Sequence, residues 1–275
     1  MKISVIIPTY NEENNIRECL STITHQLMND YEVIVVDDGS QDRTLDIVKE
    51  FKNVRIFTQK HHGAGAARNL GVTKARGEIL VFVDADMTFD KLFLKNLIKP
   101  ISGSTVGTFS KNELLGNKEN VWARCWNINR GLPATQMHSK EYPDTDRVFR
   151  AITKESFDKV HGFDEKAGYT DDYALSEKLG VMAQAADDAI FYHNNPDTLK
   201  EVYIQSKWMA KRKYKLGVIG QVGTLVARSL PFSILFGLLI GVINEVPQFF
   251  VFRVVSDFGQ FVGILEHLFG GKVTK

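Results

Sequence analysis

Cysteine is nearly absent from this sequence of 275 residues, which contains only Cys19 and Cys125. Two cysteines this far apart indicate neither a disulfide framework nor a zinc site. We also expect no signal peptide, because the opening stretch "MKISVIIP" already has the apolar pattern of a strand. We therefore expect this part of the chain to lie in the reducing environment of the cytoplasm.

An excess of charge of one sign is missing too, since the formal net charge is only +1. The sequence thus has no overall signature of nucleic-acid binding, and we expect no nucleic-acid partner. No G-x-x-x-x-G-K-[ST] loop occurs. The stretch "HHGAGAARNLG" begins as G-x-G, but its sixth position is Arg68 and it follows the third expected strand, which argues against a dinucleotide site. Arg68 beside the amides of a helix start favours an anion instead.

Alternating strand and helix patterns fill the N-terminal half of the chain. Apolar strands are expected at residues 2–8, 31–37, 54–58 and 78–84. Asn11 and Ser40 are expected to cap the first two of the intervening helices. Repeated β-α units indicate an α/β fold with a mostly parallel sheet and helices on both faces. Ligands of such sheets bind at the carboxyl ends of the strands.

Acidic side chains gather at those strand ends. Glu12 follows the first strand, Asp37 and Asp38 end the second, and Asp84 and Asp86 end the fourth. Residues two apart on a strand point the same way, so Asp84 and Asp86 are expected to converge. Carboxylates that close repel each other unless something positive lies between them. A solvated turn would explain one such pair alone, but a purely structural sheet has no need to gather carboxylates from three strands.

Four segments occur in order along the chain: "VIIPTYNEE", "VIVVDDGSQDRT", "GAGAARNLGVTKARGEILVFVDAD" and "ITKESFDKVHGFDE…YTDDYALSEKL". Together they resemble glycosyltransferase family 2. The resemblance implies the GT-A fold, a Rossmann-like mixed sheet, and transfer of a sugar from a UDP- or GDP-sugar donor. In it the first strand end cradles the nucleoside, Asp37 or Asp38 hydrogen-bonds the base, and Arg68 lies near the donor. The implied nucleotide-sugar site comprises Pro8, Thr9, Tyr10, Glu12, Asp37, Asp38, Arg68 and Asp84.

The resemblance also implies a metal ion and a base. Asp84 and Asp86 match the family's D-x-D motif, which would hold Mg²⁺ or Mn²⁺ against the donor pyrophosphate. His193 matches a position where some GT-A enzymes have a third metal ligand, although a lone histidine is more often simply hydrogen-bonded. In "GYTDDYALSEKLG" the family usually shows Glu-Asp, and that Asp is the base of an inverting transfer. We expect Asp172 rather than Asp171 to be the base, whereas charge at a helix start is the plainer explanation of both.

Long apolar runs are confined to the C-terminal part. Residues 216–244 contain a single charge, Arg228, and follow a basic cluster at residues 200–215. We place a boundary there, between a catalytic domain at 1–215 and a helical membrane-associated segment at 216–275. Residues 216–243 are long enough to cross a bilayer, but Arg228 argues against spanning. Two helices broken near residues 245–247 could instead lie in one leaflet or pack on the domain. We expect a location at the cytoplasmic face of the cell membrane and a lipid-linked or glycan acceptor.

The polar stretch 130–147 predicts a long loop beside the acceptor, of the kind that acts as a lid. Trp122 and Trp126, just before it, are expected in the core. Two other classes of protein stay open. A nucleotidyltransferase also uses paired carboxylates, but a Gly-rich, Lys-bearing loop after the first strand is missing. A non-catalytic sugar-nucleotide binder or membrane scaffold would not need both the Asp84–Asp86 pair and Asp172.

Overall fold

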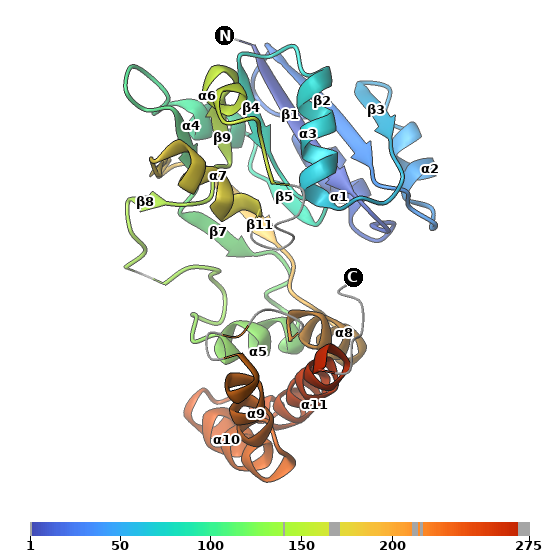
Figure 1. Ribbon diagram of the computed structural model, residues 1–275, viewed down its shortest axis with the longest axis vertical. Helices are drawn as coiled ribbons and strands as arrows, with labels where there is room; N and C mark the ends of the chain where they lie inside the picture. The colour runs from blue at the N-terminus through green and yellow to red at the C-terminus, as the bar shows by residue number, and fades with distance from the viewer. Residues whose placement is uncertain (1, 140, 165–170, 211–213, 215–216, 269–275) are drawn as a thin grey trace. The chain divides into compact units, whose positions relative to one another are not determined.

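The computed structural model describes residues 2–139, 141–164, 171–210, 214 and 217–268. Contacts divide the chain into two compact units, and Figure 1 labels their helices and strands where there is room. Unit 1 comprises residues 1–114 and 140–193, and unit 2 comprises residues 115–139 and 194–275. The predicted boundary after Lys215 falls within unit 2, and Lys215 itself lies outside the described residues, so that boundary stays a prediction.

Unit 1 contains an eight-stranded sheet with the order β3-β2-β1-β4-β9-β6-β10-β8. Strand β1 pairs in parallel with β2 and β4, and β2 with β3, whereas β9 runs antiparallel to β4 and β6. The predicted mixed, mostly parallel α/β sheet is therefore confirmed. The strands are β1 (Ile3–Thr9), β2 (Tyr31–Asp37), β3 (Val54–Thr58), β4 (Ile79–Phe82), β6 (Gly107–Phe109), β8 (Thr145–Asp146), β9 (Ala151–Thr153) and β10 (Ala183–Ala185).

Helices cover both faces of this sheet because its central strands are apolar on both sides. Ile3, Val5 and Ile7 of β1 pack with one group of helices, and Ile6 packs with the other. The first group is α1 (Ile16–Ile23), α2 (Thr44–Lys49) and α4 (Phe93–Ile98); the second is α3 (Ala64–Lys74), α6 (Lys154–Lys159) and α7 (Asp171–Leu179). A core on each face thus fixes the strand ends that carry the candidate site.

The capping predictions for Asn11 and Ser40 are wrong. Helix α1 begins only at Ile16, and α2 only at Thr44. The backbone N–H of Asn11 donates to Ser40 Oγ over 2.9 Å, and Asn11 Oδ1 accepts from the backbone N–H of Gln41 over 2.8 Å. Asn11 has a φ of 56°, a left-handed conformation that asparagine tolerates in turns. These residues therefore tie two strand-end loops to each other instead of starting helices.

A second sheet of three strands includes β5, the strand that follows β4 in the sequence. Its order is β5-β11-β7, formed by β5 (Met87–Phe89), β11 (Ile190–His193) and β7 (Asn112–Leu115). Strands β5 and β11 are antiparallel, and His193 lies opposite Met87. Because Asp86 immediately precedes β5, this register brings Asp86 and His193 together.

Unit 2 is helical. It contains α5 (Val121–Asn129), α8 (Leu199–Met209), α9 (Gly217–Ala227), α10 (Leu230–Ile243) and α11 (Phe249–Leu268). Its core includes Trp126, whose ring meets Phe252 edge-on with centroids 6.1 Å apart, and Trp122 is partly buried against the same cluster. The core positions predicted for both tryptophans agree with this packing.

The apolar tail forms three helices. Turns interrupt the helical structure at residues 228–229 and near residues 245–247. No single described helix is long and apolar enough to cross a membrane; α9 and α10 reach that length only as a pair, bent by 63°. Arg228 at the break donates to Asp257 Oδ1 over 2.5 Å, and Arg253 Nε and Ser233 Oγ contact Asp257 Oδ2 at 2.6 and 2.8 Å. The charge of Arg228 is thus neutralised within unit 2.

Candidate functional site

The carboxyl ends of β1, β2 and β4 lie side by side in unit 1. The register pairs Thr9 of β1 with Asp37 of β2, and the N–H of Val83 donates to the carbonyl of Ile6. Parallel strands end at the same edge of a sheet, so Thr9, Asp37 and Asp84 reach one edge. The edge that sequence reasoning expected is therefore present in the fold.

Two buried acceptor atoms at this edge lack a hydrogen-bond partner among the residues that the structure describes. They are Thr9 Oγ1 and Asp37 Oδ1, whereas Asp37 Oδ2 accepts from the backbone N–H of Ser40. Leaving buried polar atoms unpaired costs free energy, which a ligand that donates N–H or O–H groups would recover. Pro8 is buried beside them in β1, and the N–H of Glu12 donates to Thr44 Oγ1 over 2.7 Å.

Asp38 is fully engaged by the loop after β3. Its Oδ1 accepts from Gln59 Nε2 and from the N–H of His62, and its Oδ2 accepts from the N–H of Gly63. The anion that this loop binds is therefore the carboxylate of Asp38 itself, whereas the side chain of Arg68 contacts Asp84. His61 was expected to be a solvated loop residue, yet its ring stacks on Tyr10 with centroids 4.1 Å apart and its Nδ1 lies 2.9 Å from Asp38.

Two arginines hold Asp84. Arg68 Nη2 from α3 lies 2.8 Å from Asp84 Oδ1, and Arg150 Nη1 lies 3.3 Å from Asp84 Oδ2. Burial disfavours the charged carboxylate, but the two guanidiniums outweigh it and hold the pKa of Asp84 well below its usual range. Sequence reasoning missed Arg150 because no local motif marks it. Its position beside Asp84 follows from the antiparallel pairing of β9 with β4.

The D-x-D residues lie on a turn and not on an extended strand. Strand β4 ends at Phe82, and the N–H of Met87 donates to the carbonyl of Asp84 across the turn. The prediction that strand alternation aims Asp84 and Asp86 at one point is therefore wrong. The turn sends Asp84 toward the two arginines and Asp86 toward His193.

Asp86 forms a row with His193 and Glu113. Asp86 Oδ2 lies 3.1 Å from His193 Nε2, and His193 Nδ1 lies 2.8 Å from Glu113 Oε1. Burial lowers the pKa of His193, but the neighbouring carboxylates of Asp86 and Glu113 outweigh burial and raise that pKa well above its ordinary value. The two carboxylates thus favour the protonated form of the imidazole.

The residues around Asp86 fit a divalent cation. Asp86 Oδ1 is buried and has no hydrogen-bond partner in the described part of the chain, so one carboxylate oxygen is available as a ligand. Within the same residues no group of three or more His, Cys, Asp or Glu side chains has the arrangement of a complete metal site. Mg²⁺ commonly takes one or two carboxylates and completes its shell with substrate phosphates and water, which suits such a partial set.

Asn69, next to Arg68 in α3, holds the segment that leads toward α7. Its Nδ2 donates to the carbonyl of Phe163, and its Oδ1 accepts from the N–H of Phe163, both over 3.0 Å. Gly162 has a φ of 74°, and a Cβ there would lie 2.6 Å from Asn69 Oδ1, so only glycine fits. Lys178 of α7 donates to the carbonyl of Gly162. The structural role predicted for this segment is consistent with these contacts, although Glu165 lies outside the described residues.

Asp171 and Asp172 occupy the first turn of α7, as the sequence predicted. Leu175 of this helix is buried in the core of unit 1. The side chains of both aspartates lie outside the described part of the structure, so their roles stay predictions.

The sequence matches the pattern of Glycosyl transferase family 2 over residues 4–161, more than half of the chain. The chain belongs to glycosyltransferase family 2. A relative described as an uncharacterized glycosyltransferase, EpsJ of Bacillus subtilis, is 38% identical over 235 residues, which cover 76% of this chain and 68% of EpsJ. The resemblance seen in the four sequence segments is therefore confirmed.

Solved structures share the fold of this glycosyltransferase family 2 chain. A mannosyltransferase of Pyrobaculum calidifontis in complex with GDP-Man and Mn²⁺ aligns with a TM-score of 0.59 at 19% identity, covering 98% of this chain and 88% of that one. S. aureus TarS 1-349 in complex with UDP aligns with a TM-score of 0.56 at 19% identity, covering 98% and 92%. At this identity the likeness establishes the fold alone.

Other relatives are longer than the matching region. Glycosyltransferase AglE of Haloferax volcanii is 40% identical over 117 residues, and the match covers 40% of this chain but only 38% of AglE. The chain thus matches less than half of the length of AglE.

Proposed function

We propose that the chain transfers a sugar from a nucleoside-diphosphate sugar to an acceptor hydroxyl with inversion at the anomeric carbon, with Mg²⁺ or Mn²⁺ held at Asp86 and His193. The observation that carries this proposal is the buried, unpaired Oδ1 of Asp86 beside His193 Nε2. It lies in the same unit as the unpaired acceptors of Thr9 and Asp37. The UDP and GDP-Man in two structures of the same fold support a nucleotide donor.

Each part of the edge suits one part of such a donor. The acceptors of Thr9 and Asp37 suit the N–H and O–H donors of a nucleoside. Arg68 and Arg150 bring two positive charges to the turn that follows β4, where a diphosphate would need them. When bound, the cation would stabilise the negative charge that grows on the departing nucleoside diphosphate. The role of Asp84 as a further metal ligand stays a prediction. Both of its carboxylate oxygens already face a guanidinium.

In this proposal Asp172 is the general base that accepts the proton of the acceptor hydroxyl. Helix α7 begins with Asp171 and Asp172, and its Lys178 is bonded to the segment that Asn69 holds. A carboxylate on such a fixed helix suits a general base that must meet the acceptor on the face opposite the leaving diphosphate.

Product analysis with a panel of UDP- and GDP-sugars tests the class of reaction. We expect the full chain, given Mn²⁺, to release the nucleoside diphosphate from one of these donors. Release of pyrophosphate from a sugar phosphate and a nucleoside triphosphate would show a nucleotidyltransferase instead. Donor binding without turnover, across the panel and with both Mg²⁺ and Mn²⁺, would show a non-catalytic binder.

We further propose that unit 2 lies on the cytoplasmic face of the cell membrane and that the acceptor is lipid-linked or a glycan presented there. Support comes from the apolar residues that α9 and α10 leave exposed: Val218, Ile219, Val222, Val226, Leu230, Phe232, Ile234, Leu235, Phe236, Leu238, Leu239, Val242 and Ile243. An apolar surface of this extent usually meets a partner or a lipid bilayer. The basic residues at 200–215 suit an anionic lipid surface.

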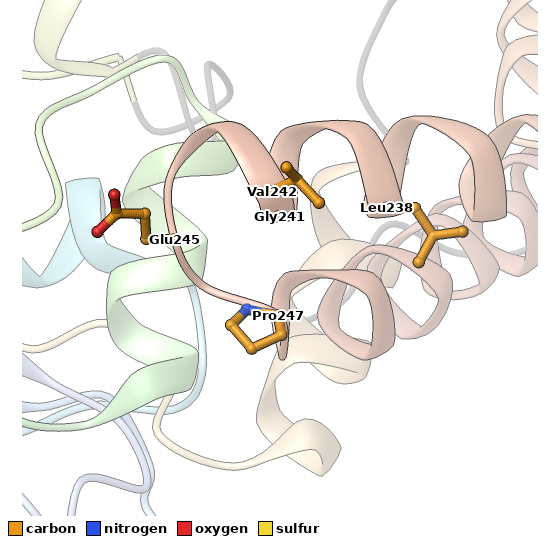
Figure 2. A pocket seen from close by; sticks show the side chains of 5 residues that line it. All are labelled: Leu238, Gly241, Val242, Glu245 and Pro247. Atoms are coloured by element: carbon orange, nitrogen blue, oxygen red, sulfur yellow. The ribbon is translucent and has the colours of Figure 1, made fainter.

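A pocket of about 280 Å³ lies at the turn between α10 and α11 (Figure 2). Leu238, Gly241, Val242, Glu245 and Pro247 line it. Because α9 and α10 are bent by 63° and Arg228 is paired with Asp257, we favour helices embedded in one leaflet over a straight span.

Flotation of the full chain with anionic liposomes tests the membrane proposal. We expect the wild-type protein to float, and the double variant Leu235→Glu/Leu239→Glu to stay at the bottom, because both side chains are more than half exposed and charge does not enter hydrocarbon. Leu27→Glu is the matched control, since Leu27 is equally exposed on unit 1. A wild-type protein that stays soluble at the bottom of the gradient without detergent would contradict the proposal.

A further inference from the structure

The imidazole of His193 lies between two carboxylates that come from different strands of the three-stranded sheet. His193 ends β11, the middle strand; Asp86 immediately precedes β5 on one side, and Glu113 belongs to β7 on the other. Nε2 faces Asp86 at 3.1 Å, and Nδ1 faces Glu113 at 2.8 Å. The side chain of Glu113 is only 13% exposed, so this contact is shielded from water.

Glu113 determines which nitrogen of His193 can bind a cation. A neutral imidazole has one N–H donor and one acceptor nitrogen, and an ionised carboxylate can only accept. Next to Glu113, Nδ1 therefore keeps its hydrogen, so a cation displaces the proton on Nε2 and takes the Nε2 lone pair. That lone pair faces Asp86, whose Oδ1 has no hydrogen-bond partner within the described residues. Two ligand atoms of a cation site are thus aimed at the same side of the ring.

Strand β7 holds Glu113 in place through contacts with the chain just before β11. The N–H of Asn112 donates to Ser110 Oγ, and Ser110 Oγ donates to the carbonyl of Ala189. Asn112 Nδ2 donates to the carbonyl of Asp187. These hydrogen bonds link the start of β7 to the residues just before β11. Two linked strands, and not a loop, therefore carry the Glu113–His193 contact.

We propose that Glu113 is a positioning residue of the cation site: it fixes the tautomer and the ring orientation of His193 so that Nε2 and Asp86 can bind the same divalent cation. The inference rests on the proposed function, which supplies the cation. It adds a residue that no sequence motif marks. Outer partners of metal-binding histidines commonly change metal affinity by about 10–100-fold when they are removed.

Mn²⁺ affinity, measured from the electron paramagnetic resonance of free Mn²⁺ in the presence of UDP, and of GDP in parallel, tests this role without turnover. We expect Glu113→Ala to raise the Kd for Mn²⁺ by about 10–100-fold. Glu113→Gln should raise it less, because the amide oxygen can still accept from Nδ1. Asp188→Ala removes an equal charge from an exposed position of unit 1 and should leave the Kd unchanged. Thermal unfolding of each variant checks that the sheet remains intact.

The tautomer provides a second readout that a merely structural role would not change. Imidazole ¹⁵N shifts of the protein with Mg²⁺ and the same nucleotide should show His193 with its hydrogen on Nδ1, assigned by comparison with His193→Gln. In Glu113→Ala we expect a mixture of tautomers at an Mg²⁺ concentration that saturates the wild type, because the variant binds less Mg²⁺ and nothing else holds the hydrogen on Nδ1.

The outcomes separate the two proposals. If Mn²⁺ binding depends on Asp86 but Glu113→Ala leaves both the Kd and the tautomer unchanged, the role of Glu113 is overturned and the cation site stands. If Asp86→Ala binds Mn²⁺ as well as the wild type does, the cation site itself is wrong, and the role of Glu113 falls with it.

Discussion

The two aspartates of the D-x-D turn differ in what already surrounds them. Both oxygens of Asp84 face guanidiniums, whereas Asp86 keeps one buried oxygen unpaired in the described structure. Asp84 therefore orders Arg68 and Arg150, and Asp86 is the better candidate for direct contact with a cation. The same sequence motif thus provides two carboxylates with different surroundings.

The pairing of Asp84 predicts a pH-dependent contribution to stability. Its folded pKa is lowered, so its contribution is complete above the unfolded value of about 3.9 and is lost as the pH falls from there through the folded pKa. We expect Asp84→Asn to lower Tm at about pH 7, and the difference from wild type to shrink at about pH 3. Thermal unfolding at both pH values checks this. A Tm difference that stays constant on acidification would show that Asp84 is not held by the two arginines.

The base assignment predicts a separation of rate from binding. Asp172→Asn should lower kcat by about a hundredfold or more and leave the KM for the donor near its wild-type value, because a general base acts on the acceptor. Asp171→Asn is the matched control and should be active. Inactivity of Asp171→Asn alone would move the base to Asp171. Full activity of both variants would indicate an acceptor oxygen that is already ionised, such as a phosphate.

Residues that act through long-range contacts were beyond the reach of sequence reasoning. The acidic strand ends could be predicted because each follows an apolar strand, and parallel strands share one edge. Arg150, Glu113 and His61 could not, because their partners are set by the register of β9, by the order β5-β11-β7 and by the fold of the loop after β3. No local spacing encodes those pairings.

At the scale of elements, the strand predictions held better than the helix starts. Central strands are apolar on both faces and have clear ends, so β1 to β4 were expected within a few residues of their observed positions. Helix starts depend on which polar side chain finds a backbone N–H. Asn11 and Ser40 bonded to each other's loops, which a single sequence cannot reveal.

The packing of α8 on α11 depends on glycine. A Cβ at Gly259 would lie 2.6 Å from the carbonyl oxygen of Tyr203, and one at Gly263 would meet the carbonyl oxygen of Lys207. We expect Gly259→Ala to lower the free energy of unfolding by about 1–3 kcal/mol, as overpacking usually does. Gly223→Ala in α9 is the matched control, because nothing lies within 4 Å of the place that its methyl group would occupy, and it should be neutral or stabilising. Denaturant unfolding measures both; equal effects of the two substitutions would contradict close α8–α11 packing.

At the scale of the whole molecule, contacts group segments that lie far apart in the sequence. Residues 115–139 cluster with the C-terminal helices in unit 2. Trp126 and Cys125 of α5 pack with Phe249 and Phe252 of α11, a contact that hydropathy along the chain cannot show. Removal of residues 216–275 would therefore expose the core of unit 2, and tests of the membrane surface belong on the full chain.

Sugar transfer at a cation held by Asp86 is the central claim, and release of nucleoside diphosphate by full-length wild type and Asp86→Ala tests it most directly. With the donor that the panel identifies, we expect wild-type release to stop in chelator and return with Mn²⁺ or Mg²⁺. Asp86→Ala should keep its fold, because Asp86 lies on a turn outside the strands, and lose nearly all release. Near-normal release by folded Asp86→Ala, or by the wild type in chelator, would contradict the claim.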